Sequence, residues 1–317
     1  MQLLLCSKKV KEKKENKEKA TMGDIKKTYS KEEKTKYFER YLKIMEKDRY
    51  FIGRCSCIEC ILCGLVINGQ QIKIFQFLEL LRNSAGIHIT SPGSLMEYTN
   101  TYMDAIHRCD LLGTMEEASY QMCAPFYTWC KNNIPNKEIF PACCLEPFYF
   151  FEPCIYNIGT DGDFSTQIEG KTLLIISSHI NTIKLQLSKL DLIFSPYKIF
   201  KNNKFIILKP PMAIGDASKE WSEHFGPFKE RVNKQVFDIA LVSCGGYGMP
   251  ICDYIYTEMK KSCIYMGGAL QLLFGIMGRR WENNEVIKKH RNQHWIYPLA
   301  SDVPLKYKVC EGGCYWR

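Results

Sequence analysis

The alternation of apolar and polar residues is most regular between Phe237 and Trp281, where apolar runs alternate with glycine turns. The apolar run FDIALVS has the length of a strand buried on both faces, and the turn Cys244–Gly248 follows it. A helical pattern continues through Met259, and the apolar run Ser262–Met266 predicts the next strand before a second glycine turn. This order of elements predicts a right-handed βαβ crossover in a mostly parallel sheet.

The same kind of pattern extends toward the N-terminus. Apolar runs predict further strands at Tyr50–Arg54, Thr172–Ser178 and Phe205–Leu208, and helical spacing predicts amphipathic helices between them. The segment Ala124–Tyr156, rich in aromatic residues, prolines and cysteines, is expected to be an irregular connection. The helix that carries Trp221 is expected to begin with Ser218 as its N-cap.

Taken together, these patterns predict an α/β fold. We expect a Rossmann-like, mostly parallel sheet flanked by helices, with one ligand crevice at the carboxyl ends of the strands and a basic helical arm at the N-terminus. No linker interrupts the pattern after the first helix. We therefore expect a basic, disordered tail over residues 1–29 and a single α/β domain over residues 30–317.

Charge and composition limit the classes of partner and the cellular location that we expect. The net charge is +9 over 317 residues, but Lys8–Lys27 carries much of the excess, so that nucleic-acid binding by the whole chain is not expected. A weaker alternative is an RNA contact made by this tail alone. The chain has no apolar run long enough to span a membrane, and Met1–Cys6 is too short for a signal-peptide core. We expect a cytoplasmic protein that is not secreted.

The chain holds sixteen cysteines, four of them in the run Cys55, Cys57, Cys60 and Cys63. This spacing could suit zinc or an iron–sulfur cluster, but no matching second pair of ligands follows, and the run lies inside an apolar helical pattern. Buried free thiols that act as small hydrophobic residues are therefore favoured over a metal site.

Several residues that could carry chemistry come directly after predicted strands. They are Ser177–His179, Lys209 and the two glycine turns, Gly245–Gly248 and Gly267–Gly268. Strand ends of a parallel sheet share one edge, and glycine turns at helix amino ends let backbone N–H groups approach a phosphate. With two arginines downstream, this pattern indicates a phosphate-bearing ligand. The alternative, that the glycines only permit tight turns and close packing, stays open.

Two familiar nucleotide-binding motifs do not match. The first glycine turn lacks the G-x-G-x-x-G spacing, and no acidic residue closes the following strand to hold a ribose. Neither turn is followed by the G-K-[ST] of a P-loop. Nicotinamide cofactors and ATPase activity are therefore not expected.

A second candidate site is the turn Arg54–Glu59 after the first predicted strand. An arginine and a carboxylate at a strand-to-helix turn can together hold a divalent ion and a diphosphate. The simpler alternative is an acidic residue that only complements the dipole of the helix that it begins.

The segment FDIALVSCGGYGMPICDYI…SCIYMGGALQLLFGIMGRRW resembles the C-terminal signature of glycosyltransferases and relatives with the GT-D fold. Further matches are Leu145–Phe150, Leu174–Ser178, Lys209–Pro211 and Glu311–Trp316. The resemblance spans roughly Tyr50 to Trp316. Similar uncharacterised proteins occur in bacteria and in large DNA viruses.

The resemblance implies transfer of a sugar from a nucleotide-sugar donor to an acceptor that the sequence does not identify. Better-studied members carry an R-x-G-D-G-E turn whose two acids bind a divalent metal and the diphosphate. Here Arg54 and Glu59 match the arginine and the second acid, whereas Cys57 replaces the first acid. A thiol is a poor ligand for Mn²⁺ or Mg²⁺, which leaves metal binding by Glu59 and activity itself open.

The resemblance also implies roles for individual residues. Glu59 would hold a metal or the acceptor hydroxyl, Arg54 would position it, and His179 would be a base or a structural residue. Arg279 and Arg280 would offset the charge of the leaving diphosphate. The donor pocket would be formed by Gly245, Gly246, Tyr247, Gly248, Gly267, Gly268 and Gln271. The alternative is a catalytically decayed relative that keeps the fold as a binding or assembly module.

Overall fold

The computed structural model describes residues 31–113, 117–135, 138–140 and 164–316. The predicted tail at residues 1–29 and the matching segment Leu145–Phe150 lie outside these ranges. Internal contacts group Lys31–Arg317 into one unit.

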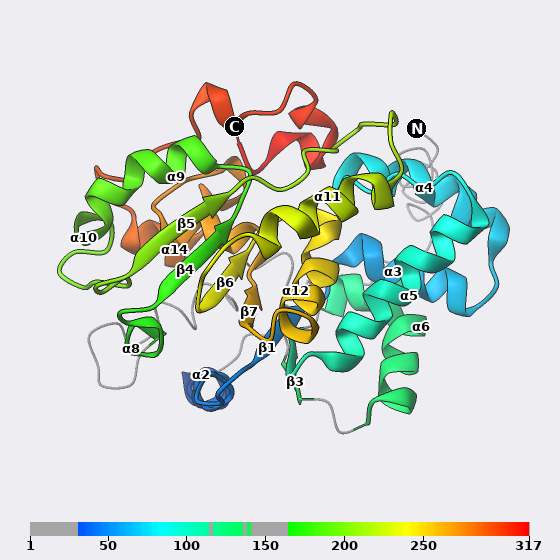
Figure 1. The fold of residues 1–317 in the computed structure, drawn as a ribbon, viewed down its shortest axis with the longest axis horizontal. Helices are drawn as coiled ribbons and strands as arrows, with labels where there is room; N and C mark the ends of the chain where they lie inside the picture. The colour runs from blue at the N-terminus through cyan, green and yellow to red at the C-terminus, as the bar shows by residue number, and fades with distance from the viewer. Residues whose placement is uncertain (1–30, 114–116, 136–137, 141–163, 317) are drawn as a thin grey trace, which may run out of the picture. The chain divides into compact units, whose positions relative to one another are not determined.

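The described residues form a seven-stranded sheet in which every pair of neighbouring strands is parallel (Figure 1). The order across the sheet is β3-β2-β1-β7-β6-β4-β5. This arrangement confirms the predicted α/β, Rossmann-like fold class. The strands are β1 (Phe51–Arg54), β2 (Leu111–Gly113), β3 (Glu138–Phe140), β4 (Thr172–Ile176), β5 (Lys204–Leu208), β6 (Ile239–Val242) and β7 (Ser262–Tyr265).

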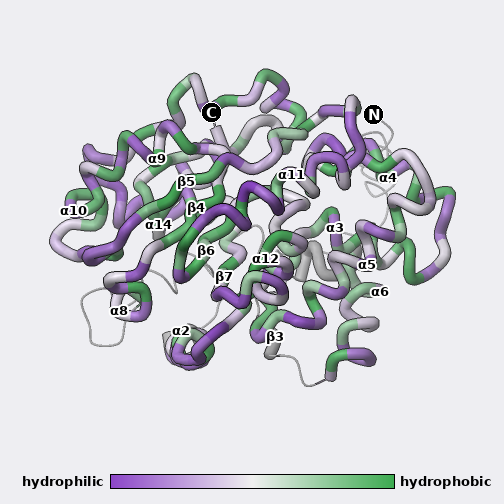
Figure 2. The backbone as a smooth tube through the Cα atoms, viewed as in Figure 1, coloured by the Kyte–Doolittle hydropathy of each residue, from purple (hydrophilic) through white to green (hydrophobic). Residues whose placement is uncertain are grey.

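The central strands are buried on both faces, as their apolar runs predict. In β6, Ala240 and Val242 pack into one hydrophobic cluster, whereas Ile239 and Leu241 pack into the other on the opposite face. The tube in Figure 2 is correspondingly hydrophobic along β4 and β6. A strand in this position has no solvent-facing side, which is why its sequence is a continuous apolar run and not an alternating one.

Helices cover both faces of the sheet. One hydrophobic cluster includes α3 (Cys57–Ile67), α4 (Gln71–Ala85), α5 (Pro92–Arg108), α6 (Glu117–Asn133), α11 (Trp221–Asn233) and α12 (Gly248–Thr257). The other includes α2 (Lys31–Met45), α8 (Phe164–Ile168), α9 (Ile180–Gln186), α10 (Leu190–Ile193), α13 (Leu270–Leu273) and α14 (Glu285–His290).

The crossover connections between the parallel strands have the same handedness. Those that step from β1 through β2 to β3, or from β6 to β7, carry their helices on the face of α12. The connection from β4 to β5 steps the opposite way and carries α9 and α10 on the other face. The chain therefore leaves the neighbouring strands β4 and β6 toward opposite faces, which opens a crevice between their carboxyl ends.

One prediction about the middle of the chain is wrong. The segment from Ala124 was expected to be irregular, but α6 continues to Asn133 even though it contains Pro125, and β3 follows it. Apolar side chains at helical spacing, including Phe126 and Cys130, are buried in the core, and this packing outweighs the unfavourable composition. Residues 141–156 lie outside the described part of the chain.

The start of α11 also differs from expectation. Its N-cap is Glu220 and not Ser218, and Glu220 forms a reciprocal capping box with Glu223. The Glu220 carboxylate also accepts a hydrogen bond of 2.6 Å from the backbone N–H of Thr90. A carboxylate that can satisfy donors on two segments at once replaces the serine predicted from local sequence.

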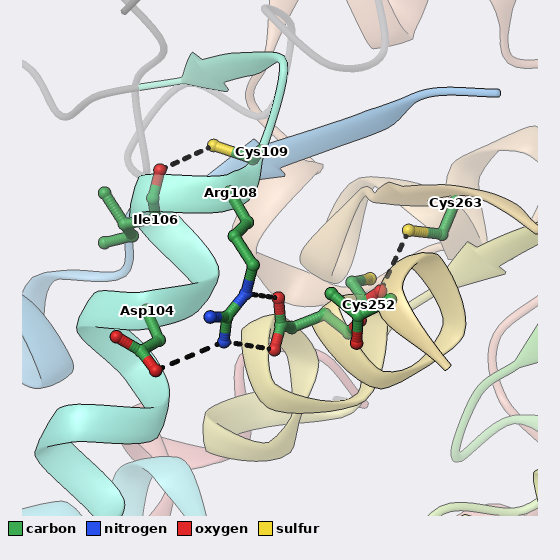
Figure 3. Close-up of polar contacts among 8 residues, drawn as sticks. Asp104, Ile106, Arg108, Cys109, Cys252 and Cys263 are labelled. Atoms are coloured by element: carbon green, nitrogen blue, oxygen red, sulfur yellow. Dashed lines mark hydrogen bonds and ion pairs between the residues drawn. The ribbon is translucent and has the colours of Figure 1, made fainter. Parts of the chain in front are cut away.

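A bidentate ion pair joins α5 to α12 (Figure 3). Arg108 Nε donates to Asp253 Oδ1 at 2.6 Å and Nη2 donates to Oδ2 at 2.8 Å, while Nη2 also reaches Asp104 at 3.3 Å. The pair holds the helix that connects β6 to β7 against α5.

Within the described residues, no helix combines the length and the apolar character that crossing a bilayer requires.

Candidate functional site

The carboxyl ends of β1, β4, β5, β6 and β7 surround one cavity. Its volume is about 160 Å³, whereas on the same measure a single water needs roughly 10–15 Å³. The cavity can therefore hold a ligand and not only ordered water. The predicted site residues that line it are Arg54, Glu59, His179, Gly245, Gly267, Gly268, Gln271 and Arg280.

Arg54 lies at the end of β1 and extends across the second glycine turn. Its guanidinium lies over the ring of Tyr265, 5.0 Å from the centroid, and its Nη1 donates to the carbonyl of Cys55 at 3.3 Å. A Cβ on Gly267 would lie 2.4 Å from the arginine Nε, and the φ angle of Gly267 is +57°. This turn needs glycine because the arginine side chain occupies the space beside it.

Glu59 lies in the first turn of α3 and is only 3% exposed. Burial raises the pKa of its carboxyl, an effect that a nearby backbone N–H, the charge of Arg54 and the nearby Ser56 hydroxyl oppose. The negative charge of Glu311 raises this pKa further. A carboxyl that keeps its proton to higher pH than usual is suited to proton transfer.

The thiols near Glu59 form no disulfide with another described cysteine. Cys60 and Cys63 are buried, and burial raises the pKa of each well above the ordinary thiol value, while Cys57 is half-buried and lines the cavity. In the ranges that the structure describes, no three His, Cys, Asp or Glu side chains are arranged to hold a metal ion. One buried carboxyl beside a thiol does not fit a Mn²⁺ or Mg²⁺ site made by the protein alone.

The tautomer of His179 follows from its neighbour. Gln271 Nε2 donates to the carbonyls of Ile276 and Tyr315, both at 3.2 Å, which leaves the amide oxygen of Gln271 as an acceptor. This oxygen lies 3.1 Å from His179 Nε2. His179 Nε2 therefore carries the hydrogen, and Gln271 orients the imidazole at the same time as it anchors the chain at Tyr315.

His179 is neutral at physiological pH. Burial lowers its pKa to about 4, although the charge of Asp302 and the contact with Gln271 act in the opposite direction. Because Nε2 carries the hydrogen, Nδ1 is a buried acceptor, and it has no hydrogen-bond partner among the described residues. A ligand hydroxyl could supply the missing donor.

One wall of the cavity comes from the segment Cys310–Trp316. Arg279 Nη2 donates to the carbonyl of Gly312 at 2.6 Å and holds the segment in place, so that this arginine does not line the cavity. The Trp316 ring lies 6.0 Å from that of His179, and its buried indole N–H has no acceptor among the residues described.

Sequence reasoning gave no role to these wall residues, which entered only through the matching segment Glu311–Trp316. The available signal was the pair of glycines followed, after Cys314, by two aromatic residues, but this irregular segment has no strand or helix period that would place it at the sheet edge.

The first glycine turn serves close packing. A Cβ on Gly248 would lie 2.2 Å from the ring of Tyr265, and one on Gly246 would lie 2.3 Å from Ile87. Neither glycine lines the cavity, and neither does Tyr247, whose ring stacks on Phe225 at 6.3 Å. These contacts support the packing alternative for Gly246 and Gly248, whereas Gly245 reaches the cavity wall.

Comparison of the chain with protein-family models, with curated proteins and with solved structures finds no match in any of the three. The resemblance to glycosyltransferases with the GT-D fold therefore stays a prediction from the sequence.

Proposed function

We propose that the cavity binds a nucleotide-sugar donor and that the protein transfers the sugar to an acceptor hydroxyl. The observation that carries this proposal is the convergence of Arg54, Glu59, His179 and Arg280 on one cavity, although they come from three distant parts of the sequence. The cavity lies at the carboxyl edge of a parallel sheet, where α/β proteins bind their ligands.

The charges of the cavity suit a diphosphate leaving group. Arg54 and Arg280 both line it, and guanidinium groups bind phosphate oxygens through paired hydrogen bonds. Gly245 brings the backbone that leads into α12 to the same wall, and the amino end of a helix favours negative charge. These groups would stabilise the charge that develops as the bond to the diphosphate breaks.

Glu59 is the residue that we assign to proton transfer. The acceptor hydroxyl gives its proton to the Glu59 carboxylate while its oxygen bonds to the sugar carbon, and the diphosphate leaves with the electron pair of the broken bond. The raised pKa of Glu59 makes it a better base once it is ionised. His179 Nδ1 and the Trp316 N–H would hydrogen-bond to ligand hydroxyls and orient them.

The Glu59→Gln variant is expected to lower the turnover of nucleotide sugars by about 10²- to 10⁴-fold, because the amide keeps the shape of the side chain but accepts no proton. UDP- and GDP-sugars, with and without Mn²⁺, would be screened by thermal shift and by release of the nucleoside diphosphate.

The matched control is Glu285→Gln, which changes an exposed carboxylate paired with Lys288 and should leave turnover unchanged. The proposal would be rejected if no donor shifts the melting temperature and Glu59→Gln behaves like this control.

The second candidate is a decayed relative that binds a ligand or partner without catalysis. The observation in its favour is Cys57, a half-buried thiol in the cavity wall at the position where the resemblance expects an acid. Cys57→Asp would restore a second carboxylate oxygen donor for a hard cation. A gain of Mn²⁺-dependent turnover would identify a weakened enzyme, and no gain would favour the binding module.

A further inference from the structure

An ion pair is part of the cavity wall. Arg280 Nη1 donates to Glu311 Oε2 at 2.9 Å and also to the hydroxyl of Tyr315, and the guanidinium lies over the Tyr315 ring. Both charged residues line the cavity. The Arg280 side chain is 16% exposed and that of Glu311 is 44% exposed, which means that solvent and ligands reach the carboxylate more easily than the guanidinium.

The backbone at Glu311 is strained. Its φ angle is +48°, in the left-handed region that is unfavourable for a residue with a Cβ, whereas the following Gly312 and Gly313 adopt +66° and +80° without that penalty. The side-chain contacts with Arg280 and with the Cys314 thiol, at 3.3 Å, help to hold the carboxylate there. Such strain is concentrated at functional sites, where a side chain is held in place.

We propose that Arg280 is a phosphate subsite, that the Glu311 carboxylate occupies it in the ligand-free protein, and that a pyrophosphate group displaces this carboxylate on binding. A guanidinium presents the same paired donors to a carboxylate and to a phosphate. A pyrophosphate carries more charge than one carboxylate and can contact Arg54 as well as Arg280. The neighbouring glycines let the segment move away without a further steric cost.

This inference rests on the proposed function, since the pyrophosphate group is that of the nucleotide-sugar donor. It adds that the ligand competes with a residue of the protein. Removal of the competitor should therefore strengthen binding, whereas a carboxylate that only stabilises the wall would weaken binding when lost.

The test measures the affinity of the full chain for inorganic pyrophosphate by titration calorimetry at low ionic strength. Glu311→Gln is expected to bind pyrophosphate about two- to fivefold more tightly than the wild type, because an accessible ion pair no longer has to be broken. Arg280→Gln is expected to bind at least about tenfold more weakly. Glu285→Gln, an exposed carboxylate outside the cavity, should match the wild type.

A second variant at position 311 shows whether a change in folding, and not loss of the carboxylate, alters the affinity. Glu311→Gly removes both the carboxylate and the penalty of the positive φ angle, so it should bind pyrophosphate as tightly as Glu311→Gln and melt no lower than that variant. Unchanged or weaker binding in both Glu311 variants would overturn the inference, as would the absence of pyrophosphate binding in all variants.

These measurements distinguish failure of the Glu311 displacement from failure of the proposed function. If the Glu311 variants bind pyrophosphate more tightly but no nucleotide sugar binds or turns over, the subsite stands and the glycosyltransferase proposal falls. If nucleotide sugars turn over while Glu311→Gln leaves pyrophosphate affinity unchanged, only the displacement is wrong.

Discussion

A fall in pH from 7 to 4.5 is expected to destabilise the folded protein through His179. Burial lowers the pKa of this side chain from 6.5 to about 4 in the folded protein. Below pH 6.5 the unfolded chain takes up a proton at this position while the folded protein does not, and stability present above pH 6.5 is lost as the pH falls toward 4. A shift of this size corresponds to about 3 kcal/mol of the free energy of unfolding.

Urea unfolding at pH 7, 5.5 and 4.5 measures this loss. The free energy of unfolding should fall more over this pH range in the wild type than in His179→Gln, because the glutamine at position 179 does not titrate. Burial also lowers the pKa of the half-buried His290, so that some pH dependence should persist in the variant. Equal slopes of stability against pH in the two proteins would show that His179 takes up a proton in the folded state as readily as in water.

Asp302→Ala is expected to lower the free energy of unfolding by about 3 kcal/mol, because it leaves buried donors without an acceptor. Asp302 is 3% exposed, and its carboxylate accepts hydrogen bonds from the backbone N–H groups of Asn181 and Thr182, at 3.2 and 2.7 Å, and from the Thr182 hydroxyl at 2.6 Å. It thereby caps α9 directly after His179 and complements the dipole of that helix.

The matched control is Asp191→Ala, which removes an exposed carboxylate paired with Lys198 and should change stability by less than about 0.5 kcal/mol. Both variants would be compared with the wild type by urea unfolding at pH 7. If Asp302→Ala is no less stable than the control, water or neighbouring groups replace the carboxylate at the start of α9.

Local sequence was sufficient for the central strands and for the crossover that joins β6 to β7. The apolar runs Leu173–Ile176 and Ile239–Val242 lie in interior strands of the sheet, where both faces are buried and each of these positions is therefore apolar. Local pattern was misleading in α6, because the burial of Phe126 and Cys130 against the rest of the core is a property of the folded molecule.

The rule that parallel strands end at one edge predicts that His179, Gly245 and Gly267 lie together, and they line the same cavity. Arg54, predicted as part of a second candidate site, lines this cavity too. The rule could not decide what the glycines do. The same residue type permits approach of a phosphate and approach of a tyrosine ring, and only the position of Tyr265 beside Gly248 distinguishes the two.

One reason explains why the sequence did not predict the wall residues of the cavity. Glu311 and Trp316 lie in a segment without regular strand or helix spacing, and their position depends on hydrogen bonds from Arg279, Arg280 and Gln271. Such side chain contacts across the fold leave no periodic trace in the sequence.

The position of β7 in the sheet has a consequence for how the chain folds. β7 lies between β1 and β6 and is the only described strand that joins β1–β3 to β4–β6, yet it comes after all of them in the sequence. Its pairing of Phe51 with Cys263 must close a very long loop. Until that happens, the inner edge of β1 offers unpaired backbone groups to other chains. We therefore expect slow refolding, with aggregation at high protein concentration.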